Sequence, residues 1–333
     1  IPSELGQLKN LIVFGSVSNQ LTGTIPSALS HCHNLTHMIL SNNELSGTIP
    51  TEFGQMKALT HLDLSSNDLS GTIPQALGSV QSLESLELFS NRLSGTLPSE
   101  FEVLPSLSKL DLSNNLLTGS IPAGFRNLTF LGLASNRYSG TIPADLASNT
   151  NLQQLYLSNN TLTGTIPGGI FEMPELHILN LAGNQLSGEL SGAPPYVCNP
   201  VGLQFNIVDL SFNKLSGTLR FFRYFSRMTL LNLRHNFFSG PIEVIIEKVI
   251  QPEGAACRIE QEISLLNHLD VGANAFTELS LIPSSISIFS AARCALGGSV
   301  APLNVLDAAT FIDVQENPNL TGEIPMEIVR SRF

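Results

Sequence analysis

The segment LTHLDLSSNDLSGTIP, residues 59–74, decides the fold, because its arrangement of leucine, asparagine, glycine and proline returns throughout the chain. Counted from Asn67, equivalent asparagines lie 24 residues away on either side, at Asn43 and Asn91. A fixed period of this size predicts a repeat array in which each unit packs only against its neighbours. Function is then expected on the surface of a solenoid rather than in a closed pocket.

Thirteen units of this kind cover nearly all of the 333 residues. Their marker positions are Asn19, Asn43, Asn67, Asn91, Asn115, Asn136, Asn160, Asn184, Asn213, Asn236, Asn274, Cys294 and Asn317. The unbroken repeat predicts a single array over 1–333, with irregular insertions at 191–204 and 243–265, although this length ordinarily suggests two domains. The chain opens and closes within a repeat, so we expect a fragment uncapped at both ends.

One unit is shorter than the rest, with 21 residues between Asn115 and Asn136. The three missing residues fall between Pro122 and Leu128, on the outer arc of the coil. The leucine and asparagine frame is intact, so the strand from Leu128 to Leu133 is predicted to stay in register with its neighbours.

The repeat resembles the plant-type leucine-rich repeat, with its Ser/Thr-Gly-x-Ile-Pro extension. The glycine of that extension stands in twelve of the thirteen units, and only the unit of Asn274 carries Glu278 instead. The resemblance, to ectodomains of receptor-like proteins and kinases, implies an α/β solenoid. Its expected form is a leucine-rich-repeat superhelix or horseshoe with a parallel inner sheet and short 3₁₀ or irregular outer arcs.

Each position of the repeat has a predicted structural role. The alternating leucines indicate a short strand that buries them and turns His61 and Asp63 outward. The amide of Asn67, which both donates and accepts, is predicted to pair with backbone groups of successive coils as one rung of a ladder. Gly71 permits a conformation that other residues avoid. The Ile-Pro pair at 73–74 fits a second short strand that the proline ends.

Composition and charge narrow the partners. The net charge is −11 and only 13% of residues are charged, which argues against nucleic acid or an anionic membrane as the principal partner. No apolar run reaches the ~18 residues of a membrane span. Any membrane contact is therefore expected through segments outside this fragment, such as a transmembrane helix, and a signal peptide or kinase is likewise expected outside it.

Four Asn-x-Thr sequons begin at Asn34, Asn127, Asn159 and Asn319. They indicate N-linked glycans on an extracellular or cell-surface glycoprotein. The alternative is that a repeat rich in asparagine and threonine generates sequons by composition alone. The family resemblance favours the extracellular reading.

The four cysteines divide between repeats and insertions. Cys32 occupies an inward position on an outer arc, and Cys294 replaces a rung asparagine. Cys198 and Cys257 lie in the two insertions, where a disulfide between them is possible in an oxidising compartment. Pairing of Cys257 with Cys294 is the alternative, and spacing does not decide between them.

Two groups of residues invite a catalytic or metal reading. His31, Cys32 and His33, followed by His37, point in different directions under the repeat geometry and lack a shared focus for tetrahedral ligation. His37 and His61 lie beside Asp63 on the outward face, yet neither a nucleophile at a strained turn nor an oxyanion feature accompanies them. We therefore expect no metal, no cofactor and no enzymatic activity.

Two stretches of the outward face are candidate binding sites. Asp63, Glu87 and Asp111 form an acidic stripe on successive repeats, at about 5 Å spacing, that either receives a basic ligand or is simply solvated. The neighbouring repeats present an apolar patch formed by Phe130, Tyr156, Ile178, Ile207 and Leu230. Contiguous exposed apolar surface marks interaction sites, and aromatic anchors dominate binding. The alternative is that an insertion folds over the patch.

A further candidate lies on the outer arc at Leu219–Arg227. The expected register turns Phe222 inward and leaves Phe221 and Tyr224 outside with Arg220, a composition typical of protein interfaces. The same residues could instead pack against the insertion that follows.

These features favour non-enzymatic extracellular recognition: the repeat region of a receptor-like surface protein that binds a protein, peptide or glycan. Two alternatives stay open. One is a structural component of a cell wall or extracellular assembly, and the other is a secreted inhibitor of a hydrolase.

Overall fold

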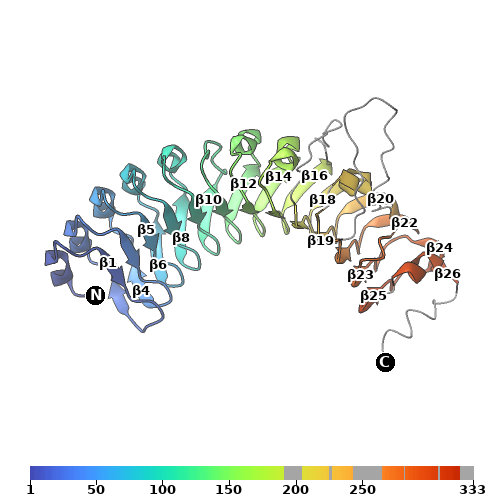
Figure 1. Ribbon diagram of the computed structural model, residues 1–333, viewed down its shortest axis with the longest axis horizontal. Helices are drawn as coiled ribbons and strands as arrows, with labels where there is room; N and C mark the ends of the chain where they lie inside the picture. The colour runs from blue at the N-terminus through green and yellow to red at the C-terminus, as the bar shows by residue number, and fades with distance from the viewer. Residues whose placement is uncertain (191–204, 225–226, 243–264, 281, 307, 323–333) are drawn as a thin grey trace. The chain divides into compact units, whose positions relative to one another are not determined.

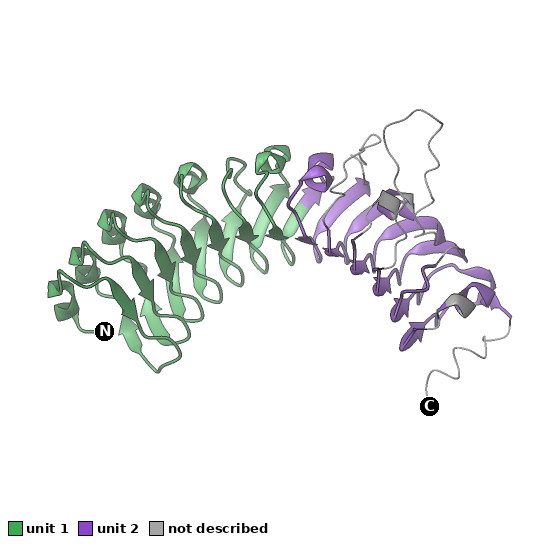
Figure 2. Ribbon diagram, viewed as in Figure 1, with its two compact units in different colours: residues 1–162 green, residues 163–333 purple. Residues whose placement is uncertain are grey.

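The computed structural model describes residues 1–190, 205–224, 227–242, 265–280, 282–306 and 308–322. They form two compact units, unit 1 over Ile1–Leu162 and unit 2 over Thr163–Phe333 (Figure 2). Within the described residues every helix is a short 3₁₀ helix, and two series of 13 short strands alternate along the chain. The predicted fold class, a leucine-rich-repeat solenoid of parallel strands with short outer arcs, is confirmed (Figure 1).

The first series contains the odd-numbered strands, which pair in parallel and in sequence order within each unit and are called here the first sheet. In unit 1 they are β1 (Val13–Gly15), β3 (His37–Ile39), β5 (His61–Asp63), β7 (Ser85–Glu87), β9 (Lys109–Asp111), β11 (Phe130–Gly132) and β13 (Gln154–Tyr156). In unit 2 they are β15 (Ile178–Asn180), β17 (Ile207–Asp209), β19 (Leu230–Asn232), β21 (His268–Asp270), β23 (Ile288–Ser290) and β25 (Phe311–Asp313).

The even-numbered strands form the second sheet, which follows the first within each coil. They are β2 (Thr22–Thr24), β4 (Glu44–Gly47), β6 (Asp68–Thr72), β8 (Arg92–Thr96), β10 (Leu116–Gly119), β12 (Arg137–Thr141), β14 (Thr161–Gly164), β16 (Gln185–Glu189), β18 (Lys214–Gly217), β20 (Phe237–Ile242), β22 (Ala275–Leu279), β24 (Gly297–Ser299) and β26 (Asn319–Thr321).

The outer arcs carry the 3₁₀ helices, each of five or six residues. They are η1 (Ser3–Gln7), η2 (Ser27–His31), η3 (Thr51–Gln55), η4 (Gln75–Ser79), η5 (Ser99–Val103), η6 (Ala144–Ser148), η7 (Gly168–Glu172), η8 (Leu219–Tyr224) and η9 (Ala301–Val305). No helix in the described part of the chain is long and apolar enough to cross a membrane.

The strand alternation sets the register of the first sheet. In β5, Leu62 is fully buried while His61 and Asp63 are half-exposed, as predicted. The short unit keeps this register, because Phe130 pairs with Lys109 on one side and with Gln154 on the other. Its arc between β10 and β11 has no 3₁₀ helix, and the buried Phe125 fills the interior there. The prediction of an unbroken strand at this unit is confirmed.

The asparagine ladder is confirmed in atomic detail. Asn67 is buried, and its Nδ2 donates to the carbonyl oxygens of Leu64 in its own coil (3.1 Å) and Leu40 in the preceding coil (3.0 Å). Its Oδ1 accepts from the backbone N–H of Leu45 at 3.0 Å. One side chain thus satisfies backbone groups of two coils that would otherwise be buried without partners.

The glycine and proline positions are partly as predicted. Gly71 has φ +80°, and a Cβ there would lie 2.9 Å from Cγ2 of Thr48. Both the backbone conformation and the close approach require glycine. The prediction of a second strand at Ile73 and Pro74 was wrong, because β6 ends at Thr72 and Pro74 precedes η4. Proline has no N–H for a ladder but its φ suits the start of a helical turn.

The residue before each rung has a left-handed conformation. Its φ lies between +51° and +57° wherever it is not glycine. In unit 1 this position holds serine or asparagine, whereas unit 2 places Phe212 and His235 there. A bulky side chain at positive φ is unfavourable for the backbone, so Phe212 and His235 do not stand at this position for the stability of the turn itself.

The cysteines of the repeats are buried. Cys32 is inaccessible, as predicted, and its Sγ donates to the carbonyl oxygen of Leu5. Cys294 is a free thiol whose Sγ contacts the carbonyl oxygen of Val271 at 3.4 Å, in the manner of a rung. Cys198 and Cys257 lie outside the described residues, as do the insertions apart from Leu265.

Candidate functional site on the first sheet

Two columns of side chains project from the exposed face of the first sheet, one residue from each strand. In unit 1 the first column contains Val13, His37, His61, Ser85, Lys109, Phe130 and Gln154. The second column contains Gly15, Ile39, Asp63, Glu87, Asp111, Gly132 and Tyr156. The predicted acidic stripe therefore occupies three successive positions of the second column.

Aromatic and charged side chains meet on β9, β11 and β13. The rings of Phe130 and Tyr156 lie 5.5 Å apart, between their centroids, at an interplanar angle of 39°. Lys109 Nζ lies 5.8 Å from the centre of the Phe130 ring. We call Lys109, Asp111, Phe130, Gly132 and Tyr156 the aromatic-acid cluster.

Gly132 makes this cluster possible. It stands at an outward position, yet it is buried because neighbouring side chains cover it. A Cβ at Gly132 would lie 2.5 Å from Oδ1 of Asp111 and 2.9 Å from Cε1 of Phe130. The absence of a side chain thus lets a carboxylate and a ring fold over the strand from two different repeats.

Asp111 is the unusual charge of the cluster. Its Oδ1 accepts from the backbone N–H of Ser113 at 3.1 Å. Lys109 instead pairs with Glu87, at 2.8 Å between Nζ and Oε2, and no other lysine or arginine among the described residues forms an ion pair with Asp111. Burial raises the pKa of Asp111 and the charge of Glu87 adds to the rise, whereas hydrogen bonds from Ser113 and the charge of Lys109 lower it in part.

Tyr156 responds to the same surroundings. Its hydroxyl donates to Oε1 of Gln154 at 3.2 Å. Partial burial raises the pKa of the Tyr156 phenol, and the charge of Asp111 contributes to that shift. A half-buried carboxylate beside two aromatic faces is suited to a ligand cation, which could pair with Asp111 and stack on a ring.

The other two members of the acidic stripe already have partners. Oδ1 of Asp63 accepts from the hydroxyl of Ser65 at 2.6 Å, and Glu87 holds Lys109. Both carboxylates are half-exposed. Asp63 and Glu87 therefore add negative electrostatic potential next to the aromatic-acid cluster and do not form a second binding site.

Unit 2 has its own apolar outward positions. Ile178, Ile207 and Leu230 occupy successive, in-register positions on β15, β17 and β19. All three side chains are half-exposed. Of the five residues of the predicted apolar patch, the structure places these three in unit 2 and Phe130 and Tyr156 in unit 1. None of the five is buried, and the insertion that could cover them lies outside the described residues.

The expected outer-arc site requires a correction. Phe221 was expected to be exposed, but it is buried, with its ring 4.8 Å from that of Phe171 in an edge-on contact. Phe222 is buried as well, as predicted. Phe221 and Phe222 are the third and fourth residues of η8, the same two positions that are buried in the five-residue helix η7. The side chains of Arg220 and Tyr224 lie outside the described residues.

Sequence reasoning missed the stacked pair of Phe212 and His235 in unit 2. The Phe212 ring stacks on His235, with centroids 4.5 Å apart, and 54% of Phe212 is exposed. Partial burial lowers the pKa of His235, as do Arg234 and Arg293 nearby. The signal was available, because phenylalanine stands where the other repeats carry mostly serine or asparagine.

Other candidate positions are accessible. The four sequon asparagines, Asn34, Asn127, Asn159 and Asn319, are all exposed.

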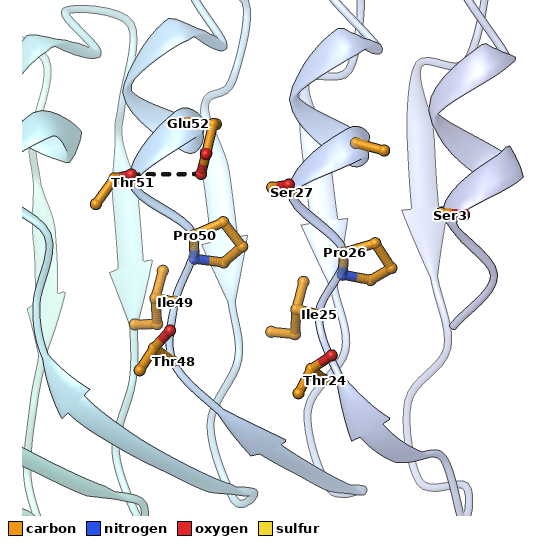
Figure 3. Close-up of a pocket in the computed structure, with 11 residues that line it drawn as sticks. Ser3, Thr24, Ile25, Pro26, Ser27, Thr48, Ile49, Pro50, Thr51 and Glu52 are labelled. Atoms are coloured by element: carbon orange, nitrogen blue, oxygen red, sulfur yellow. Dashed lines mark hydrogen bonds between the residues drawn. The ribbon is translucent and has the colours of Figure 1, made fainter.

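On the outer side of unit 1, an open depression of about 560 Å³ is lined by matching segments of adjacent coils. Figure 3 shows Thr24, Ile25 and Pro26 in the same orientation as Thr48, Ile49 and Pro50. This repetition reflects the period of the coil.

The family of the chain follows from its repeats. A family model described as "Leucine rich repeat" matches residues 7–69 and 126–186, and a second model of the same description matches residues 82–104 and 106–128. The chain belongs to the leucine-rich-repeat family. No curated protein matches it in sequence.

Solved structures with the same fold include plant receptors. A plant peptide hormone receptor, RGFR1, in complex with RGF2 is 28% identical to this chain, with a TM-score of 0.82. The match covers 100% of this chain and 55% of the receptor chain. The Arabidopsis receptor kinase HAESA, in complex with the peptide hormone IDA and a co-receptor, is 29% identical at a TM-score of 0.79, with coverage of 100% and 58%. The chain thus spans somewhat over half the length of these receptor structures.

A third similar structure has a different printed role. A plant ice-binding protein is 31% identical at a TM-score of 0.57, and the match covers 71% of this chain and 79% of that one. The same repeat therefore occurs both in peptide receptors and in a protein that binds a crystal surface.

Proposed function

We propose that this chain is the ligand-binding repeat region of an extracellular, receptor-like protein and that it has no enzymatic role. Membership of the leucine-rich-repeat family supports this reading, as does the likeness to receptor structures solved with peptide hormones. The four exposed sequons support an extracellular glycoprotein with N-linked glycans. The ligand is a peptide or an extended segment of a protein.

One observation carries the proposed site. Asp111 is half-buried beside the Phe130 ring, and no lysine or arginine among the described residues forms an ion pair with it. Partial burial of a charge is unfavourable unless a counter-charge is supplied, and a ligand can supply it. The aromatic-acid cluster therefore receives a basic side chain, by pairing with Asp111 and stacking on Phe130 or Tyr156. The apolar positions Ile178, Ile207 and Leu230 of unit 2 receive apolar side chains.

The test is selection of peptides against the intact chain. A randomised peptide library is enriched for binders, and the selected peptides are measured against Asp111→Asn and Tyr156→Ala. We expect enrichment of arginine or lysine and at least about a tenfold loss of affinity for each variant, since truncating one partner of a desolvated charged pair costs 2–5 kcal/mol. Asp270→Asn is the matched control, because Asp270 occupies the same column but already pairs with Arg234 at 3.6 Å.

Two outcomes would favour the alternatives. If the selected peptides bind Asp111→Asn and Tyr156→Ala as tightly as the unaltered chain, the cluster is not the site. A Tyr156→Ala/Ile207→Asp double variant that melts normally and retains binding would move the site to the outer arc around Arg220 and Tyr224. Inhibition of a purified cell-wall hydrolase would favour the secreted inhibitor, and failure to enrich any peptide would favour the structural component.

A second candidate function rests on the second sheet of unit 1. Threonine or serine recurs at the exposed end of its strands, as in Thr24, Thr48, Thr72 and Thr96, and the threonine methyl groups sit against the glycine of the next coil. At a strand spacing of about 4.8 Å this gives a regular array of hydroxyl and methyl groups. Such an array can match a crystal lattice, and the similar plant structure is an ice-binding protein. Inhibition of ice recrystallisation that Thr72→Lys abolishes would support this function.

A further inference from the structure

The histidines at the start of the first column form a pair that the aromatic-acid cluster does not use. His37 on β3 and His61 on β5 are in-register neighbours. Their rings are stacked face to face, with centroids 4.4 Å apart and an interplanar angle of 6°. Both side chains are half-exposed, so a ligand group can reach them.

The hydrogen bonds assign the proton on each ring. Nδ1 of His37 lies 2.8 Å from the hydroxyl oxygen of Thr36, and Nδ1 of His61 lies 2.9 Å from that of Thr60. Each threonine hydroxyl donates its single proton to a carbonyl oxygen of the preceding coil, at 3.0 Å. The Nδ1–H of each neutral imidazole therefore donates to the threonine oxygen, which leaves Nε2 as an acceptor.

Repeats without histidine support this assignment. Thr129 and Thr229 precede Phe130 and Leu230, which have no ring nitrogen. Their hydroxyls still donate to carbonyl oxygens of the preceding coil, at 3.1 Å and 2.9 Å. Donation to the carbonyl is thus a property of the repeat, and a histidine beside such a hydroxyl must supply its own proton.

The stacking makes the two acceptors parallel. Both rings are held at Nδ1 in the same way, so their Nε2 lone pairs point in one direction and are separated by about the centroid distance of 4.4 Å. Parallel lone pairs do not converge on one point, so the pair is unsuited to a metal ion. It suits a ligand group that brings two parallel donors. No hydrogen-bond partner of either Nε2 atom lies among the described residues.

A guanidinium group has the matching geometry. Two of its N–H groups form a planar fork, with nitrogens about 2.3 Å apart. Centred over acceptors 4.4 Å apart, the fork makes two N–H···N bonds of about 2.9 Å that depart from the lone-pair directions by about 20°. An ammonium has a single nitrogen, so reaching both acceptors bends each bond by about 50°. The pair therefore discriminates arginine from lysine.

We propose that His37 and His61 together bind the guanidinium of a ligand arginine, as a second basic subsite of the first sheet. This rests on the proposed function, because it places a further side chain of the same peptide. The nearby charges agree with a cationic ligand group. Asp63 lies on the strand of His61, and its in-register neighbour is Glu87, so the surroundings carry negative potential.

The register sets the spacing of the two basic residues of the ligand. In the strand order β3-β5-β7-β9, the midpoint of the histidine pair lies two and a half strand spacings, about 12 Å, from Asp111 on β9. An extended peptide advances about 3.3–3.6 Å per residue. The arginine over the histidines is therefore three or four residues from the basic residue that pairs with Asp111.

The first experiment is a long-range ¹H–¹⁵N spectrum of the intact chain with labelled histidine, which reports the protonated nitrogen of each ring. The probes are N-acetylarginine amide and N-acetyllysine amide, titrated to millimolar concentration. We expect arginine to shift the Nε2 signals of His37 and His61 together, and lysine to bind at least about tenfold more weakly. Equal binding of the two probes, or no shift with arginine, would overturn the proposal.

Variants separate this pair from single surface histidines. His61→Phe keeps a stacked ring but removes one acceptor, so arginine should bind at least about tenfold more weakly and lose its advantage over lysine. Thr60→Val removes the oxygen that accepts from Nδ1–H, so His61 should show more of the Nε2-protonated tautomer and weaker arginine binding.

His268→Phe is the matched control. His268 occupies the same column, but its in-register neighbours are Leu230 and Ile288, so it offers one acceptor and the substitution should leave the shifts of the pair unchanged. Unchanged arginine binding in His61→Phe, or an equal loss in His268→Phe, would contradict the proposal. A normal thermal melt of each variant excludes unfolding as the cause.

The second experiment uses the peptides selected against the chain. Replacing the predicted arginine of the peptide with lysine should weaken binding about tenfold in the unaltered chain and leave binding to His61→Phe unchanged. If peptides bind through Asp111 and this replacement has no effect, the histidine pair is not a subsite, although the proposed function stands. If no peptide is selected, the proposed function fails, and the spectrum still decides whether the pair binds arginine.

Discussion

Replacing a single rung of the asparagine ladder is expected to cost less than the number of its hydrogen bonds suggests. Asn91 donates to the carbonyl oxygens of Leu64 (3.0 Å) and Leu88 (3.1 Å) and accepts from the N–H of Leu69 (3.0 Å). In Asn91→Ala, however, the Leu64 oxygen keeps its bond from Asn67, and the Leu88 oxygen keeps its bond from Asn115. The buried N–H of Leu69 is the group that loses its side-chain partner.

The magnitude follows from this sharing. An unsatisfied buried donor costs about 1–3 kcal/mol, so Asn91→Ala should destabilise by about that amount. The Asn67→Ala/Asn91→Ala double variant removes both amides from the Leu64 oxygen. It should therefore cost about 1–3 kcal/mol more than the sum of the single variants. Asn67 and Asn136 share no carbonyl, so the corresponding double variant should be additive.

The assay combines thermal melting with hydrogen exchange. For a chain of this size, 1 kcal/mol shifts Tm by about 2 °C. Exchange at the Leu69 amide reports the local loss directly and does not require the array to unfold in one step. Asn151→Ala, at an exposed asparagine, controls for composition. An unchanged melt in Asn91→Ala, or additivity in the adjacent double variant, would refute the shared ladder.

Three further substitutions test other positions. Cys294→Asn should stabilise by about 0.5–1.5 kcal/mol, because the amide restores rung bonds that a thiol makes weakly; a lower Tm would contradict this. Phe212→Asn should raise the free energy of unfolding by up to about 1 kcal/mol, and with it Tm, because asparagine tolerates positive φ. A lower Tm would show that the stacking of Phe212 on His235 contributes more than the backbone strain costs. Asp111→Asn should stabilise at neutral pH and have no effect below the normal pKa of aspartate, as comparison of melts at pH 7 and pH 3 would test.

The sign for Asp111 follows from proton linkage. Its pKa is raised in the folded chain, so the folded state holds this proton more tightly than the unfolded state does. The stability contributed by the protonated carboxyl is then lost as pH rises through the raised pKa, and the charged form is unfavourable at neutral pH. Asparagine removes that penalty. A melt in which the substitution lowers Tm at pH 7 would contradict this account.

The inward half of the molecule follows from the sequence because the period leaves little freedom. Once the inward positions of Leu62 and Asn67 are known in one unit, strand alternation and the repeat period assign the inward and outward positions of all the other units. This includes the short unit before Asn136. The arcs are less constrained. In η8 the third and fourth residues, Phe221 and Phe222, are both buried, as are the third and fourth residues of η7, whereas strand-like alternation predicts only one of two adjacent residues inside.

The candidate sites were only half visible in the sequence for a related reason. Alternation identified Phe130, Tyr156 and Asp111 as outward residues, but not that Gly132 lets the ring of Phe130 and the carboxylate of Asp111 meet over it. Likewise, His37 and His61 were visible as neighbours, whereas the face-to-face stacking of their rings, with centroids 4.4 Å apart, was not. Side-chain direction and hydrogen-bond partners are set by three-dimensional contacts that spacing does not encode.

The arrangement separates stability from recognition. The residues that satisfy the backbone, such as Asn67 and Asn91, are buried and repeat in almost every coil, so the fold tolerates variation elsewhere. The unfavourable features stand on the exposed side: a carboxylate without a cation at Asp111 and a phenylalanine at positive φ at Phe212. Residues that destabilise the free chain are expected at surfaces where a bound partner compensates for their cost. For Asp111 the proposed partner is a ligand cation, so the substitution that stabilises the free chain is also expected to weaken its binding at least about tenfold.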